Sequence, residues 1–284
     1  MIQDIYPKHL DNHYEPHKPV GKDTVFYFHE KEILGRVNEK EELVYPSYDE
    51  FTAKTKGVEY TYIYLFSIDD DRFFLAIKKH LQNEALIEGY HFYGVNSFRK
   101  AKPKDRAFAA ITAFHLFNWY RDNQFCGRCG KPMVHDGRER MMRCDCCKNM
   151  VFPKICPAVI VAVTNKDKIL LTKYAGRDYT NYALIAGFTE IGETTEETVH
   201  REVMEEVGIK VKNLTYYKSQ PWALSGSLLT GFFCEIDGDD YIHIDEDELS
   251  LGTWVDAKDL DLEDDGISLT REMMLEFKRK VLNT

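Results

Sequence analysis

The sequence has no long hydrophobic run. None of its 284 residues belongs to a stretch that approaches the roughly 18 consecutive apolar residues of a membrane-spanning helix. The opening stretch, MIQDIYPKHLDNHYEP, also lacks the cationic start, apolar core and cleavage site of a secretory leader. These absences argue against a membrane span and against export, so we expect a soluble cytoplasmic protein.

Positive charge is also scarce. The chain has 37 Lys and Arg residues against 47 Asp and Glu residues, a formal net charge of −10. Such an excess of negative charge works against broad electrostatic binding to nucleic acid or to an anionic membrane surface. The hydrophobic fraction, 44%, is ordinary for a globular protein, and the length allows more than one domain.

The cysteines do not suit a disulfide framework, because there are seven of them and four occur in two close pairs. The pairs, Cys126 with Cys129 and Cys144 with Cys147, are spaced C-x2-C-x14-C-x2-C. This spacing is typical of two knuckles whose four thiolates bind one zinc ion tetrahedrally. A site closed by four protein ligands leaves no position for a substrate, so we predict a structural zinc ribbon over residues 124–152.

Three alternatives remain for this segment. Cys146 could replace Cys147 as the fourth ligand. Two local disulfides would form in an oxidising compartment, which the expected cytoplasmic location disfavours. A nucleic-acid-binding ribbon is the third interpretation, although basic residues are commonly a solvated face. The basic residues of the segment include Lys131, Arg138, Arg140, Arg143 and Lys148.

The first 123 residues have the pattern of a small β-rich domain. Residues 24–35 and 59–67 are rich in aromatic and β-branched side chains with partial alternation, which predicts strands. An acidic turn then leads to FFLAI at 73–77, which predicts a hairpin. From Lys104 apolar residues recur at helical spacing, so we expect the domain to end in a long amphipathic helix.

A glutamate-rich helix dominates the rest of the chain. Two apolar strands and a third segment, 181–188, lead into it. Glu202, Glu205 and Glu206 stand at i, i+3 and i+4, the spacing that places side chains on one helix face. Like charges at this spacing repel one another, so either water solvates them or a cation neutralises them. A solvated acidic helix is therefore the simple alternative to a metal site.

The residues around these glutamates favour the cation. Positions 187–209 match every fixed position of G-x5-E-x7-R-E-U-x-E-E-x-G-U, where U is a bulky aliphatic residue. The segment thus resembles the Nudix box, the signature of hydrolases that cut nucleoside diphosphates linked to another moiety. By this resemblance Arg201 should pair with Glu193. The sequence itself predicts an N-terminal cap at Thr194 or Thr195, a left-handed stop at Gly208, and a buried stripe of Val199, Val203 and Val207.

A second motif narrows the resemblance. Ser219-Gln220-Pro221-Trp222 follows the box, and the four-cysteine segment precedes it. In this order the motifs resemble the NADH pyrophosphatase family of Nudix hydrolases, which has SQPWPFPxS where this chain has SQPWALSGS. Ser227 matches, whereas Ala223, Leu224 and Ser225 differ, a difference that bears on substrate preference. Leu251 stands where the family usually has a second acidic residue.

The pattern of the first 123 residues, together with the resemblance, which covers roughly residues 100–284, predicts an α+β chain with three domains. These are the N-terminal domain (1–123), the zinc ribbon (124–152) and a Nudix α/β/α sandwich with a mixed sheet (153–284), which closes with an amphipathic helix. The implied reaction is hydrolysis of the pyrophosphate in NADH or NAD to nicotinamide mononucleotide and AMP, with removal of NAD caps from RNA as a related activity. A homodimer is expected as well.

The implied site combines metal ligands and aromatic residues. Glu206, or a water held by the glutamate cluster, would act as the base. Phe152 and Phe188 would sandwich a base of the substrate, with packing in the core as the alternative for both and for Trp222. The ligands for Mg²⁺ or Mn²⁺ would be Glu202, Glu205, Glu206 and Glu248, and the other substrate contacts Ser219, Gln220, Pro221, Trp222 and Ser227.

Two other functions compete with this one. A Nudix hydrolase of ADP-ribose, a dinucleoside polyphosphate or capped RNA would share the box and differ in the altered segment after Trp222. A non-catalytic nucleotide sensor would bind a ligand in the Nudix domain and recruit a partner through the zinc segment. The complete glutamate set argues against the sensor, because a sensor need not retain a hydrolytic metal site.

Overall fold

The computed structural model describes residues 1–78, 87–176 and 181–283. The chain forms two compact units. The C-terminal unit comprises Ile155–Thr284 with Met1, and the N-terminal unit comprises Ile2–Lys154. The further division of the N-terminal part at residue 123 stays a prediction. In the described part of the chain, no helix has both the length and the apolar character needed to cross a membrane.

The C-terminal unit is built on a mixed six-stranded sheet. Its strand order is β15-β16-β12-β13-β17, with β14 paired to β12. The pair β12 and β16 is parallel, and the other pairs are antiparallel. The strands are β12 (Cys156–Asn165), β13 (Lys168–Tyr174), β14 (Ile185–Phe188), β15 (Val211–Trp222), β16 (Ser227–Ile236) and β17 (Leu249–Asp256).

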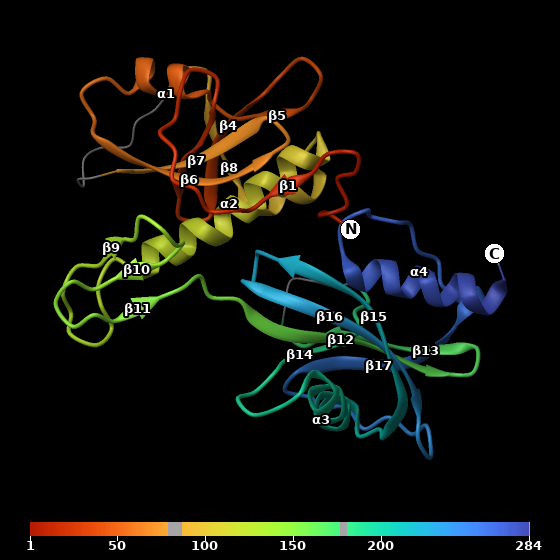
Figure 1. Cartoon of the computed structure of the whole chain (residues 1–284). Coiled ribbons are helices and arrows are strands. Elements are labelled where there is room, and N and C mark those ends of the chain that lie inside the picture. The colour runs from red at the N-terminus through yellow and green to blue at the C-terminus, as the bar shows by residue number, and fades with distance from the viewer. Residues whose placement is uncertain (79–86, 177–180, 284) are drawn as a thin grey trace. The chain divides into compact units, whose positions relative to one another are not determined.

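One helix covers each face of this sheet, α3 (Thr195–Val207) on one side and α4 (Leu269–Leu282) on the other (Figure 1). Alternate residues of β12 explain the two cores, because successive side chains of a strand point to opposite faces. Val159 packs with the valine stripe of α3, and Ile160 packs with Leu269 of α4. The predicted α/β/α sandwich and the predicted closing helix are both confirmed. A short 3-10 helix, η2 (Ala257–Asp259), follows β17.

Helix α3 begins and ends as its sequence predicts. The side chain of Thr194 accepts a hydrogen bond from the backbone of Glu197, whose carboxylate bonds back to Thr194, so the two form a capping box. Gly208 ends the helix with φ 70°, the left-handed conformation that glycine adopts without a steric penalty. The three valines of the stripe are fully buried.

The N-terminal unit contains two four-stranded sheets. The predicted hairpin is confirmed by β6 and β7, which pair antiparallel. The predicted strand over 24–35 is instead divided, because its first part pairs with β7 and its later parts belong to the second sheet. The first sheet has the order β1 (Leu10–Asp11), β6 (Tyr60–Ile68), β7 (Asp71–Lys78), β2 (Thr24–Phe26), and the second contains β3 (Phe28–His29), β4 (Glu32–Val37), β5 (Leu43–Val44) and β8 (His91–Gly94).

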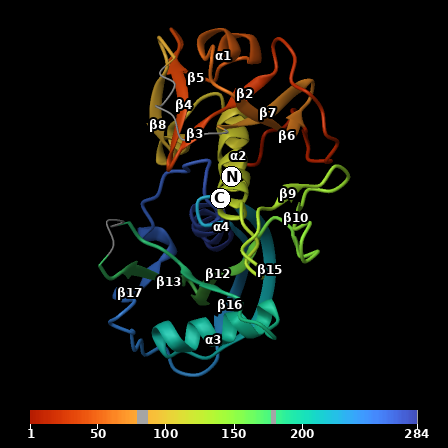
Figure 2. The ribbon, with the colours of Figure 1, turned by 90° about the vertical axis from the view of Figure 1, so that its left-hand side faces the viewer.

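Helix α2 (Lys104–Asp122) lies between these sheets, with β3, β4, β5 and β8 on one side of it and β6 and β7 on the other (Figure 2). Phe28 of the second sheet stacks against Phe117 and contacts Phe114. The predicted helix is confirmed, but five consecutive residues, 107–111, are buried. It is therefore covered on more than one side, unlike a helix with a single apolar stripe. Two short helices, α1 (Tyr48–Lys54) and η1 (Val95–Lys100), complete this part.

Candidate active site and metal centre

The four predicted zinc ligands come together in the N-terminal unit, beside a three-stranded sheet of β9 (Val134–His135), β10 (Met142–Arg143) and β11 (Met150–Val151). Their sulfur atoms all lie within 4.8 Å of one another. The Sγ atoms of Cys126 and Cys147 are 3.5 Å apart, as are those of Cys129 and Cys144. Tetrahedral zinc with bonds of about 2.3 Å separates its sulfurs by roughly 3.8 Å, so this donor set fits one zinc ion.

The two halves of the cluster share one backbone pattern. Cys126 donates its N–H to the carbonyl of Lys131, and Gly130 donates back to Cys126. In the second half Cys144 donates to Asn149, and Lys148 donates back to Cys144. Gly130 and Lys148 both have positive φ, 69° and 60°. Cys146 is exposed and lies outside the cluster, so the geometry selects Cys147 as the fourth sulfur.

In the C-terminal unit, α3 does not expose its three glutamates equally. Glu202 and Glu206 are only 8% and 3% exposed, whereas Glu205 is exposed. Burying a carboxylate is costly unless another group compensates its charge. The face is therefore not a simply solvated one, which was the alternative to a metal site.

Arg201 joins the box loop to the helix. Its guanidinium donates two hydrogen bonds to the carboxylate of Glu193, at 2.6 and 2.9 Å, which confirms the predicted pair. It also donates to the carboxylates of Glu202 (2.7 Å) and Glu205 (3.0 Å) and to the carbonyl of Phe188 (2.9 Å). The hydrogen bonds from Arg201 lower the pKa of Glu193 to about 2. The arginine is thus fully occupied in holding protein groups.

Glu202 lies directly against the backbone of β14. A Cβ atom at Gly187 would stand 1.8 Å from the carboxylate carbon of Glu202, so only glycine leaves room for this side chain. Burial raises the pKa of Glu202; Arg201 lowers it, and the charges of Glu205 and Glu248 raise it further. A buried carboxylate beside two others is a set of hard oxygen donors whose repulsion a divalent cation would relieve, so the chemistry of these side chains suits a divalent cation.

The carboxylates of the box do not converge on one point. Among the described residues, only the four cysteines place three or more ligand atoms within mutual reach of one metal ion. At the box, the guanidinium of Arg201 stands between Glu202 and Glu205. The assignment of Glu202, Glu205, Glu206 and Glu248 as ligands stays a prediction.

The residues predicted to contact the substrate lie on both faces of the sheet. Phe188, Ala158, Leu229 and Gln220 occupy one row across four strands, and this row faces α4. By strand alternation Trp222 and Ser227 share that face, whereas Ser219 and Pro221 point to the face that α3 covers. The register therefore divides the predicted set between two environments.

Gln220 has a role that its motif does not reveal. Its side chain is fully buried, donates to the carbonyl of Ile267 (2.7 Å) and accepts from the N–H of Leu269 (2.7 Å). It therefore holds the first residues of α4. The sequence marks Gln220 through its place in the motif, but only the partner segment, almost 50 residues away, reveals what the amide does.

The two aromatic residues proposed to sandwich a base are both exposed. Phe188, at the end of β14, and Phe152, in the N-terminal unit, are each 52% exposed. Neither ring is therefore a core side chain. Trp222 is half-buried. Contact of these rings with a substrate stays a prediction.

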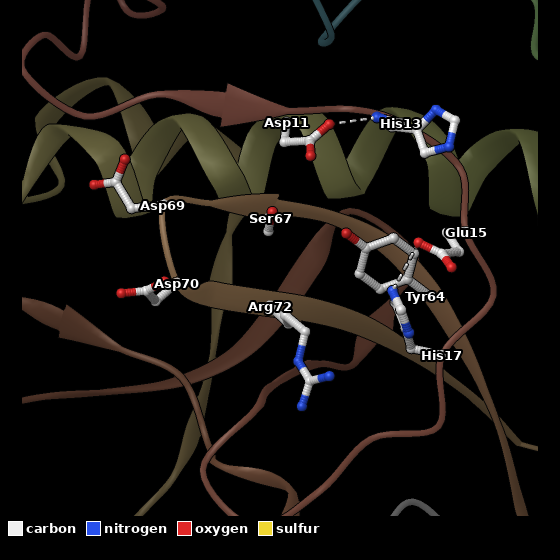
Figure 3. A pocket seen from close by; sticks show the side chains of 9 residues that line it. All are labelled: Asp11, His13, Glu15, His17, Tyr64, Ser67, Asp69, Asp70 and Arg72. Atoms are coloured by element: carbon white, nitrogen blue, oxygen red, sulfur yellow. Dashed lines mark hydrogen bonds and ion pairs between the residues drawn. The ribbon is translucent and has the colours of Figure 1, made fainter.

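A pocket of about 270 Å³ opens elsewhere, on the N-terminal unit (Figure 3). Several of its polar groups already have partners, since Arg72 pairs with Asp23, and Asp11 accepts a hydrogen bond from the backbone of His13. It contains none of the predicted site residues, so we assign it no function. Its lining residues are Asp11, His13, Glu15, His17, Tyr64, Ser67, Asp69, Asp70 and Arg72.

Protein-family models match the two regions of the chain that contain these residues. Residues 154–277 match the NUDIX domain, which defines the C-terminal unit as a Nudix domain. Residues 121–152, which hold the cysteine cluster, match the NADH pyrophosphatase zinc ribbon domain. The chain therefore carries a Nudix domain preceded by the zinc ribbon of the NADH pyrophosphatases, and the resemblance found in its sequence is confirmed.

Known proteins are similar in sequence to part of this chain. It is 45% identical over 147 residues to the NAD-capped RNA hydrolase NudC of Salmonella schwarzengrund (strain CVM19633), and 44% identical over 147 residues to the protein of that name from Salmonella typhi. Each match covers 52% of this chain and 57% of the relative, so the chain spans little more than half the length of these relatives. A solved NUDIX hydrolase from Nitrosomonas europaea covers 56% of this chain and 93% of its own, with 16% identity and a TM-score of 0.46.

Proposed function

We propose that this protein hydrolyses the pyrophosphate bond of NADH or NAD and releases nicotinamide mononucleotide and AMP. One observation carries the proposal. A complete Nudix box, with Glu202 and Glu206 buried on its helix, follows a zinc ribbon of the NADH pyrophosphatase type. The box indicates hydrolysis of a pyrophosphate bond, and the ribbon indicates that the substrate is a nicotinamide dinucleotide.

The glutamates and Arg201 have different tasks in this reaction. A divalent cation, Mg²⁺ or Mn²⁺, would neutralise the bridging oxygens and lower the pKa of an attacking water. Glu202, Glu205, Glu206 and Glu248 would hold it. Glu206 would accept the proton of that water. Alternatively, a water held by the glutamate cluster would act as the base. Arg201 fixes the box loop against the helix and does not contact the substrate, since its donors already serve Glu193 and its neighbours.

Substrate recognition would rest on the exposed aromatic residues. Phe188 and Phe152 each offer a ring face on which a base can stack, and stacking requires only an aromatic surface. Ser219, Pro221, Trp222 and Ser227 would contact the rest of the dinucleotide, and Gln220 would act through the segment that it holds. A homodimer in the cytoplasm, with the two phenylalanines meeting across the subunit interface, completes this proposal.

Removal of NAD caps from RNA is the second candidate, because the relatives carry the name NAD-capped RNA hydrolase. The altered segment after Trp222 bears on this choice. The N–H of Ser225 donates to the carbonyl of Trp222 (3.3 Å), a hydrogen bond that the proline of the family motif could not make. The altered turn lies beside the predicted substrate residues and could change substrate preference. ADP-ribose and dinucleoside polyphosphates are therefore included in the substrate test.

A substrate panel tests the proposal. The protein is incubated with NADH, NAD, ADP-ribose, a dinucleoside polyphosphate and NAD-capped RNA, each with Mg²⁺ or Mn²⁺, and the products are separated by chromatography. We expect the highest kcat/KM for NADH, NAD or capped RNA, with cleavage between the two phosphates. Rapid turnover of another nucleotide, with no nicotinamide mononucleotide formed, would refute the substrate assignment.

A variant pair tests the catalytic assignment. Glu206→Gln should reduce kcat by at least about a hundredfold while the protein stays folded, because a positioned general base contributes roughly 10²- to 10⁴-fold. Glu196→Gln removes the same charge from the exposed first turn of α3 and should leave kcat unchanged. Full activity in Glu206→Gln would exclude the role given to Glu206.

A further inference from the structure

The loop between β16 and β17 is bound to the end of the helix that carries the box. The last carbonyls of a helix have no partner within the helix. Here the carbonyl of Glu206 accepts from the N–H of Asp245, and that of Val207 accepts from the N–H of His243, both at 3.0 Å. A Cβ at Gly208 would come within 3.1 Å of the Cβ of His243, so the loop and helix end are in close contact.

Asp245 also organises the turn that follows it. Its carbonyl accepts hydrogen bonds from Glu248 (3.2 Å) and Leu249 (2.8 Å), and its Oδ1 accepts from the N–H of Asp247 (2.9 Å). Leu249 is buried in the same core as the valine stripe of α3. The turn is thus anchored at Asp245 on one side and at Leu249 on the other, and Glu248 stands between the two anchors.

Glu248 lies three residues after Asp245, whose N–H is bonded to the carbonyl of Glu206, so the turn brings Glu248 to the end of the helix that carries the box glutamates. It is exposed, so packing alone does not set its position. Its backbone is held instead, by the carbonyl of Asp245 on one side and by the N–H of Ala175, which donates to the carbonyl of Glu248 (2.8 Å), on the other.

We propose that Asp245 is a positioning residue that ties Glu248 to the backbone of Glu206 and so places the fourth carboxylate of the proposed metal site at the end of the helix that carries the other three. The inference rests on the proposed function, because it assumes that these glutamates hold the metal. The side chain of Asp245 acts through the shape of the turn. Its Oδ1 must be an acceptor at a set distance, and its negative charge is not needed.

Two substitutions separate shape from charge. Asp245→Asn keeps an oxygen at the position of Oδ1 and loses the charge. Asp245→Glu keeps the charge, but its longer side chain cannot close the same turn. We expect Asp245→Asn to bind Mn²⁺ within about twofold of the unaltered protein, and Asp245→Glu to bind it about tenfold more weakly, the effect typical of residues that orient a ligand. Binding of Mn²⁺ alone is measured by electron paramagnetic resonance on the full chain.

A matched control and a coupling test complete the experiment. Glu246→Ala removes one negative charge from the same turn, leaves the Asp245–Asp247 hydrogen bond in place, and should not change the affinity for Mn²⁺. Glu248→Gln should weaken it, and adding Asp245→Glu to Glu248→Gln should cause no further loss, because a positioning residue has nothing left to position. Thermal unfolding of each variant shows whether the protein is folded.

The inference is overturned if Asp245→Asn binds Mn²⁺ as weakly as Asp245→Glu, if the losses from Asp245→Glu and Glu248→Gln multiply, or if Glu248→Gln binds normally. An unfolded Asp245→Glu would show that the turn serves stability and would count against the inference as well. The proposed function fails separately. A protein that shows the expected Mn²⁺ pattern but cleaves no nicotinamide dinucleotide would contradict the substrate and leave the role of Asp245 standing.

Discussion

The carboxylate of Glu202 occupies the space where any side chain at position 187 would begin. The carbon and one oxygen of that carboxylate lie 1.8 and 1.9 Å from the ideal Cβ position of Gly187, far inside contact distance. The first glycine of the box therefore serves a glutamate fifteen positions later. The close approach of strand and carboxylate sets where this buried acid stands.

Replacing this glycine should displace Glu202. We expect Gly187→Ala to lower kcat by about a hundredfold, because a misplacement of about 1 Å in an active site can have an effect of this size. Gly94→Ala is the matched control, since a Cβ there meets no atom within 4 Å. Steady-state kinetics with thermal unfolding tests both variants, and a fully active, stable Gly187→Ala would contradict the crowding argument.

The ion pair of Arg201 and Glu193 should make the protein less stable to unfolding as the pH falls. The folded-state pKa of Glu193 is about 2, below the roughly 4.3 of an unperturbed glutamate. Its contribution is therefore complete above the unfolded value and is lost as the pH falls towards about 2. We expect Glu193→Gln to unfold at a lower temperature than the unaltered protein at pH 7, with a difference that shrinks below about pH 4.

Thermal scans from pH 7 to pH 3 measure this difference. Arg201→Lys should show much of the same loss at pH 7, because a lysine cannot reproduce the two parallel hydrogen bonds of the guanidinium. A difference that stays constant over the whole range would show that the ionised carboxylate of Glu193 is not what stabilises the loop.

The geometry of the cysteine cluster predicts which cysteines are needed to bind zinc. Cys144→Ser should lose the metal and destabilise the ribbon, because a structural zinc site contributes directly to folding. Cys146→Ser should keep one zinc per chain, since Cys146 is exposed and outside the cluster. Zinc content by atomic emission, before and after dialysis against a chelator, distinguishes the two. Loss of zinc from Cys146→Ser alone would reverse the assignment.

Phe188 should act through its ring face. Phe188→Leu keeps an apolar side chain and should lower kcat/KM about tenfold to a hundredfold, since stacking of a base on an aromatic ring is worth ~1–3 kcal/mol. Phe188→Tyr keeps the ring and should retain most of the activity. Equal activity of the leucine and tyrosine variants, measured on the best substrate of the panel, would mean that the ring does not stack on the substrate.

Local patterns in the sequence were enough for several parts of the structure. The box predicted a capped helix that ends at Gly208, and the valine spacing predicted its buried side. These features depend on neighbours three or four residues apart, so the linear sequence contains them. The hairpin of β6 and β7 and the cysteine cluster were predictable for a similar reason, because a short turn and a close pair of thiols are recognisable by spacing.

Other parts depended on long-range packing. Residues 24–35 were predicted as one strand, but in the structure the first part pairs in one sheet and the later parts pair in the other. The local residue pattern does not contain this pairing. Helix α2 has an aromatic stripe, yet the two sheets around it bury more than that stripe. Adjacent residues of a strand always point to opposite faces, but only the pairing in the sheet decides that Gln220 faces α4 and Ser219 faces α3.

By itself, the sequence determined that this chain carries a glutamate cluster of the Nudix type, a four-cysteine zinc ribbon and a motif typical of the NADH pyrophosphatases. Their chemistry follows from residue type and short spacing. Only the tertiary structure decided that Glu202 lies against Gly187, that Gln220 holds α4, and that Asp245 joins Glu206 to Glu248. The physical reason is that each of these contacts joins segments that are separated in the chain. Only packing of the folded chain brings them within a few ångströms of one another.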